Sequence, residues 1–112
     1  MPVLGERVDQ EAQTLSGGER KMLGIGMAYA LAPKVVLMDE PTEGVAPVTV
    51  EKLLPAIRTL TETSAVLLVE QNVDTAVALG SHGYVLEHGD IVESGMVAVM
   101  HAQGILERRL SL

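Results

Sequence analysis

The sequence predicts a layered α/β fold with a mostly parallel sheet, flanking helices and a terminal β-hairpin. Two short apolar runs, residues 35–38 and 65–69, are each followed by a segment with helical character. Short Val- and Leu-rich runs that alternate with helices are typical of parallel strands buried on both faces. Two further short strands, 84–87 and 91–93, flank a Gly-containing turn at 88–90, which predicts an antiparallel pair near the C-terminus.

The first predicted helix covers residues 17–32. Ser16 is its expected N-cap, and Glu19 follows at the spacing of a capping box. Pro33 should end the helix, because proline has no backbone N–H to continue the hydrogen-bond ladder.

Three further helical segments are expected. The segment 47–62 contains Pro55, which predicts a kink or a split. A short helix at 73–79 should end at Gly80. The segment 96–112 is predicted to be helical in pieces, with a break at a glycine.

Composition limits the function classes. The chain has 112 residues, which is one domain or less, and 47% of them are hydrophobic, as in globular proteins. A net charge of −7 argues against general nucleic-acid binding, because no basic stripe is available to displace counterions from phosphates. The sequence has no Cys, which excludes thiolate metal sites, and no apolar run long enough to span a bilayer. The first residues lack the pattern of a signal peptide. The three histidines, His82, His88 and His101, lack metal-ligand spacing.

Asp39 and Glu40 follow the first apolar strand directly. Loops at the carboxyl ends of parallel strands form the usual ligand crevice of such sheets. Asp39 could hold Mg²⁺ there beside a bound phosphate, and Glu40 could orient or deprotonate an attacking water. The alternative is that the two acids only cap the next turn.

Two other segments could take part in phosphate chemistry. The unpaired N–H groups at the start of the helix after Ser16 could hold an anion, and Gly17 and Gly18 would let it approach. A plain capping box is the alternative. Gln71, after the second apolar strand, could hydrogen-bond a terminal phosphate or water, whereas its neighbour Asn72 fits an N-cap.

Three segments in this order resemble the ATP-binding subunits of ABC transporters, which are P-loop NTPases. They are Leu-Ser-Gly-Gly-Glu-Arg at 15–20, Val-Val-Leu-Met-Asp-Glu-Pro-Thr at 35–42 and Leu-Leu-Val-Glu-Gln at 67–71. The resemblance covers nearly the whole chain but only the C-terminal half of such a domain.

The resemblance implies roles for these segments. The strand 35–39 is similar to Walker B, with Asp39 on the Mg²⁺ side, Glu40 as catalytic base and residues 44–47 as the D-loop. Gln71 stands at the switch position, where most of the family has His. The signature motif, which contacts the γ-phosphate of ATP held by another subunit, is similar to Leu15, Ser16, Gly17, Gly18 and Glu19.

The resemblance also implies cofactors, partners and a location. ATP and Mg²⁺ would be the cofactors, and the partners would be a second ATPase subunit, arranged head to tail, and transmembrane permease subunits. No nucleic acid is expected. The subunit would be cytoplasmic and peripheral on the inner face of the membrane. Gln71 and the segments 43–47 and 83–89 resemble subunits that serve branched-chain or other hydrophobic amino acids, or urea.

The resemblance divides the chain into an entry segment at 1–14, the signature helix at 15–32 and a Walker B to C-terminal part at 33–112. No Gly-Lys pair of a Walker A motif occurs in the sequence, so we expect a truncated or split ATPase that is inactive alone. The alternatives are half of a soluble ABC-type ATPase of the DNA-repair kind, or a non-catalytic ABC fragment that serves as an interaction module.

Overall fold

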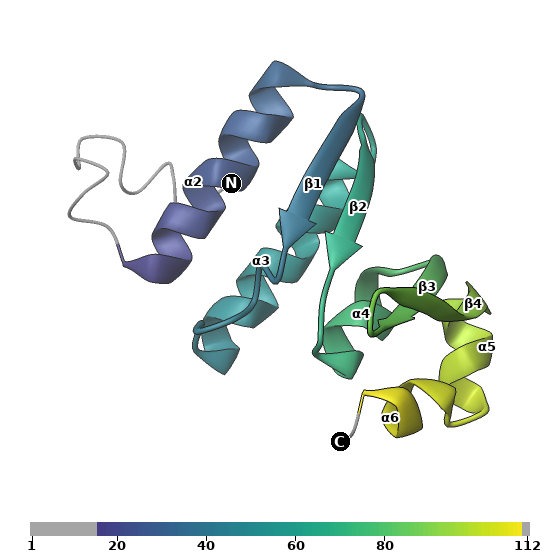
Figure 1. Ribbon diagram of the computed structural model, residues 1–112. Helices are drawn as coiled ribbons and strands as arrows, with labels where there is room; N and C mark the ends of the chain where they lie inside the picture. Colours follow the sequence, from purple (N-terminus) through teal and green to yellow (C-terminus); the bar gives the residue numbers. More distant parts are fainter. Residues whose placement is uncertain (1–15, 111–112) are drawn as a thin grey trace. The chain divides into compact units, whose positions relative to one another are not determined.

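The computed structural model describes residues 16–110, which form two compact units that divide between Val69 and Glu70. Figure 1 shows the helices and strands in chain order. They are α2 (Gly17–Leu31), β1 (Val35–Asp39), α3 (Pro47–Leu60), β2 (Ala65–Val69), α4 (Val73–Leu79), β3 (His82–Glu87), β4 (Asp90–Met96), α5 (Val97–Ala102) and α6 (Ile105–Arg109).

In the first unit, β1 and β2 pair in parallel, from Val35 opposite Ala65 to Asp39 opposite Val69. The helix α3 connects them and lies behind the strand pair in Figure 1. Its buried side chains pack with those of α2, and together they form the core of this unit: Met22, Ile25, Leu53, Ala56, Ile57 and Leu60. The predicted α/β fold with parallel strands is confirmed.

One prediction about this sheet is wrong. The strands alternate between exposed and half-buried residues, so they are not buried on both faces by the described part of the chain. Leu37 is 74% exposed and Leu67 is 57% exposed, whereas Val36 and Leu68, on the other face, are half-buried. The apolar runs suit burial on two faces, but the described residues cover only one.

The proline in α3 does not split the helix, which runs without interruption from Pro47 to Leu60. Pro55 lies on the exposed side of α3. The carbonyl that loses its helical partner there can therefore bond to water, while the opposite side stays packed on the core.

The second unit has its own core and the predicted hairpin. The strands β3 and β4 pair antiparallel, joined by a turn in which His88 has φ 51° and Gly89 has φ 84°. Positive φ at both central residues is the geometry of a type I′ turn, whose twist matches that of paired strands. The core is made by Val73, Val85, Val97, Met100 and Leu106.

The C-terminal helices are tied to this hairpin. Gly104, with φ 72°, separates α5 from α6, as the glycine break predicts. Arg109 of α6 donates to Glu87 of β3 and to Glu93 of β4, each at 3.2 Å. No helix in the described range 16–110 has the length and apolar character needed to cross a membrane.

Candidate functional site

The acidic pair lies where the sequence places it, at the carboxyl end of the parallel strands. Asp39 is the last residue of β1 and is exposed. The backbone N–H of Glu40 donates to the carbonyl of Val69, the last residue of β2, at 2.7 Å. The two strand ends are therefore joined at the acidic pair, which stands at the edge where sheets of this class bind ligands.

Glu40 has an uncommon backbone conformation, with φ 47°. A non-glycine residue in this left-handed region costs of order 1–3 kcal/mol and persists only where its surroundings fix it. The hydrogen bond to Val69 is one such constraint. Two backbone hydrogen bonds of the next turn follow in the chain. Glu43 N donates to Glu40 O at 3.1 Å, and Val45 N donates to Thr42 O at 3.3 Å. Residues 40–45, here called the acidic loop, thus form a compact turn after β1.

One residue of this site was missed by sequence reasoning. Lys21, on α2, donates from Nζ to the carbonyl of Glu43 at 2.8 Å and to that of Glu40 at 3.5 Å. No motif signals such a contact, because its acceptors are backbone atoms 19 and 22 residues away.

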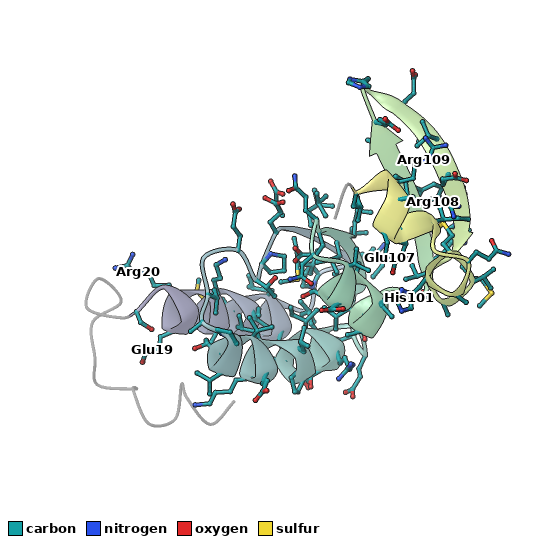
Figure 2. All side chains as sticks on the ribbon, turned by 90° about the horizontal axis from the view of Figure 1, so that it is seen from below. Glu19, Arg20, His101, Glu107, Arg108 and Arg109 are labelled. Atoms are coloured by element: carbon teal, nitrogen blue, oxygen red, sulfur yellow. The ribbon has the colours of Figure 1, made fainter. Side chains whose placement is uncertain are left out.

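The start of α2 is a complete capping box. Ser16 Oγ accepts from Glu19 N at 3.2 Å, and Glu19 Oε1 accepts from Ser16 N at 3.4 Å. The predicted cap is therefore confirmed, while phosphate binding there stays a prediction. Figure 2 labels Glu19 and Arg20 at this end of α2, on opposite sides of the helix in that view. Leu15 lies outside the described residues.

The two glycines of this segment differ in their surroundings. Beyond its own helical turn, a Cβ at Gly17 would have no described atom within 4 Å, whereas a Cβ at Gly18 would lie 2.4 Å from Cγ2 of Thr49, on α3. Gly17 therefore leaves the backbone open to a ligand. Gly18 instead allows α2 and α3 to pack closely.

Gln71 belongs to the second unit and is exposed. Its neighbours perform the local hydrogen bonding: Asn72 Oδ1 caps α4 by accepting from Thr75 N at 3.1 Å, and Glu70 Oε1 accepts from Asn72 N at 3.2 Å. The predicted cap by Asn72 is confirmed. That Gln71 reaches the ligand of Asp39 stays a prediction, since the two residues belong to different units.

The donors present fit Mg²⁺ better than a metal held in an all-protein cage. Within residues 16–110 no three His, Asp or Glu side chains gather as a metal cluster. Mg²⁺ commonly needs only one or two carboxylates, because waters and phosphate oxygens complete its octahedron. An exposed carboxylate at a strand end, as at Asp39, suits that mode.

The matches of this chain to known proteins agree on one family. The family model described as ABC transporter matches residues 2–43. The high-affinity branched-chain amino acid transport ATP-binding protein BraG of Pseudomonas aeruginosa is 47% identical over 92 residues, which are 81% of this chain and 40% of BraG. The methionine import ATP-binding protein MetN 1 of Rhodococcus jostii is 35% identical over 84% of this chain and 28% of MetN 1.

Solved structures agree with the sequence relatives. MJ1267, an ATP-binding cassette of an ABC transporter, matches with a TM-score of 0.77 and 27% identity, over 95% of this chain and 44% of MJ1267. A nucleotide-free ATP-binding cassette matches with a TM-score of 0.73 and 29% identity, over 85% of this chain and 40% of that one. The chain therefore spans less than half the length of these relatives.

Proposed function

This chain belongs to the ABC transporter ATP-binding family, and we propose that it supplies the hydrolytic acids and the signature helix of an ATP-hydrolysing domain. The observation that carries the proposal is the position of Asp39 and Glu40. They follow β1 at the shared carboxyl end of β1 and β2, and Glu40 is fixed there by its hydrogen bond to Val69. The domain would comprise an entry segment at 1–14, a signature helix at 15–32 and a Walker B to C-terminal part at 33–112.

In this proposal the acids act on one ATP molecule. Asp39 would hold Mg²⁺, directly or through water, and the bound ion would supply positive charge beside the phosphates. Glu40 accepts a proton from the attacking water or orients it. Gln71 hydrogen-bonds the terminal phosphate or the same water.

The start of α2 would serve the ATP of a second, head-to-tail subunit. Its open N–H groups and the positive end of the helix dipole favour an anion. Gly17 suits close approach of a phosphate to the backbone, because no described atom beyond its own helical turn lies within 4 Å of where its Cβ would be. The motif proposed to face this ATP is Leu15, Ser16, Gly17, Gly18 and Glu19.

The relatives support a transport role. BraG, a branched-chain amino acid transport protein, shares more residues with this chain than MetN 1 does, at 47% against 35%. We therefore propose import of branched-chain amino acids, with permease subunits as partners and a location at the inner face of the membrane. No nucleic acid takes part.

The test is a hybrid in which this chain replaces the aligned region of BraG. Glu40→Gln should lower the ATPase rate about 100-fold or more, because a general base contributes 10²–10⁴-fold, while binding of a fluorescent ATP analogue persists. Glu43→Gln is the matched control, since its side chain has no proposed role, and should leave the rate within about twofold. An unchanged ATPase rate in the Glu40→Gln hybrid would contradict the catalytic role of Glu40.

Asp39→Asn should raise the Mg²⁺ concentration needed for half-maximal rate in the same hybrid, because one ligand charge is lost.

A further inference from the structure

We propose that Lys21 is a positioning residue that clamps the acidic loop, residues 40–45, onto α2 and so fixes the orientation of Glu40. The clamp is a property of the first unit alone, because α2 and the acidic loop both belong to it. Its consequence for hydrolysis rests on the proposed function, in which Glu40 is the base.

The contact is directed at the backbone of the loop. Lys21 Nζ is 2.8 Å from the carbonyl oxygen of Glu43 and 3.5 Å from that of Glu40. An ammonium carries three donors and no acceptor, so one Lys can bind two carbonyls at once. Hydrogen bonds from a charged donor are about twice as strong as neutral ones. The side chain of Lys21 therefore links α2 to both ends of the first turn of the loop.

Burial of Pro41 and Thr42 and backbone hydrogen bonds also hold the loop in the unit. Glu40 N is held by Val69 of β2, and the bonds that follow, from Glu43 to Glu40 and from Val45 to Thr42, lie within the loop. The loop also contains two left-handed residues, Glu40 with φ 47° and Gly44 with φ 71°. A non-glycine residue relaxes out of that region when it is released, so the second anchor matters most at Glu40.

The clamp joins two functions that the proposal assigns to different nucleotides. The residues before Lys21 on α2 would face the ATP of a second subunit, and Glu40 would act on the other ATP. Since Lys21 contacts the loop directly, a shift of α2 moves a donor that holds the carbonyl of Glu40. The structure thus provides a direct link between the signature helix and the proposed base.

The first experiment measures the clamp itself, in the 112-residue chain and independently of ATP. Lys21→Met keeps an apolar stem and removes the donors. Amide hydrogen exchange at Glu43 and Val45 should become roughly 5- to 10-fold faster, the effect of losing one partly exposed charged hydrogen bond. Lys21→Arg, which can also donate to two carbonyls, should restore most of the protection.

The controls separate the clamp from general loss of structure. Lys34→Met removes an exposed lysine of the same unit and should leave exchange in the loop unchanged. Amides of α4, in the second unit, should not respond to any of these variants. If Lys21→Met lowers the helical circular dichroism, Lys21→Ala, which favours the helix and also lacks donors, gives the same comparison. Exchange in Lys21→Met equal to that in Lys34→Met would overturn the proposal.

The second experiment measures the consequence in the BraG hybrid. Lys21→Met should lower kcat about 10-fold and leave KM for ATP within about twofold, because a displaced base affects the chemical step rather than binding. Lys21→Arg should recover kcat. Faster loop exchange with unchanged kcat would show that the clamp does not position Glu40, which overturns that part. If instead Glu40→Gln leaves the rate unchanged while loop exchange responds to Lys21→Met, the proposed function fails and the clamp stands.

Discussion

Replacing Gly18 by Ala should force α2 and α3 apart, because the new Cβ would lie 2.4 Å from Cγ2 of Thr49. Real Cβ atoms do not approach a carbon so closely, so a side chain or a helix must move. Thr49 is β-branched and stiff at χ1, and it adapts poorly to the added methyl group. The packing of the first unit is therefore expected to weaken.

The magnitude follows from two opposing terms. Overpacking a well-packed contact costs about 1–3 kcal/mol. Ala in place of Gly gains up to about 1 kcal/mol in a helix interior. The net destabilisation of Gly18→Ala should thus be about 0–3 kcal/mol in the wild-type background.

Thr49→Ser tests the cause, because it removes the clashing methyl group. The other atoms of Thr49 near the new Cβ are its own Cβ at 3.5 Å and Oγ1 at 3.7 Å, which are ordinary contact distances. In that background Gly18→Ala should be neutral or stabilising by up to about 1 kcal/mol. The coupling between the two positions should be about 1–3 kcal/mol.

The assay is native-state hydrogen exchange at slowly exchanging amides of α2 and α3, which reports the opening of the first unit by itself. Gly24→Ala is the matched control, since it lies on the same helix and has no described atom within 4 Å of the new Cβ. It should stabilise α2 by up to about 1 kcal/mol. An equal cost of Gly18→Ala in both Thr49 backgrounds, or a stabilisation like that of Gly24→Ala, would refute a clash between the new Cβ and Thr49.

Two further predictions concern the two cores. Leu53→Ala, at a side chain with 0% exposure, should destabilise the first unit by about 2–5 kcal/mol. Val48→Ala, at 64% exposure on the same helix, should destabilise it far less. Hydrogen exchange of α3 amides measures both effects. In the second unit, the pKa of Glu107 lies below its ordinary value of 4.5. The main cause is that its own backbone N–H donates a hydrogen bond to the carboxylate. A side-chain hydrogen bond with His101, whose Nδ1 is 2.6 Å from Oε1 of Glu107, also lowers the pKa. A lowered folded pKa stabilises above the unfolded value, so this contribution is complete above 4.5 and is lost as pH falls through the lowered value. Glu107→Gln should therefore flatten the decline of the urea midpoint on acidification, and an equally steep decline in the variant would contradict this assignment.

The sequence predicted elements well where the signal is local. The strand at 65–69 and the helix at 73–79 appear with the expected bounds, since an apolar run, an Asn cap and a terminal Gly each act within a few residues. The hairpin is longer than predicted, because residues 82–83 and 94–96 pair despite lacking a strand-like apolar pattern. The ladder hydrogen bonds continue beyond the apolar pattern that predicted the strands.

The candidate site also has features with a local sequence signal and features without one. The place of Asp39 and Glu40 at a strand end follows from the apolar run before them, and the capping box follows from the spacing of Ser16 and Glu19. The contact of Lys21 with the loop could not be predicted, because it depends on how α2 packs and on backbone acceptors that carry no residue signature. The packing role of Gly18 is tertiary for the same reason.

The guanidinium of Arg109 has a practical consequence for handling the protein. It is the cation between Glu87 and Glu93, and all three side chains are 30–43% exposed, so added salt should weaken this contact. Arg109 is the last residue of α6, and Figure 2 labels it beside the strands of the hairpin. Trimming the chain before this residue would leave two carboxylates on the hairpin without their cation. Low-salt buffers should therefore favour an intact second unit.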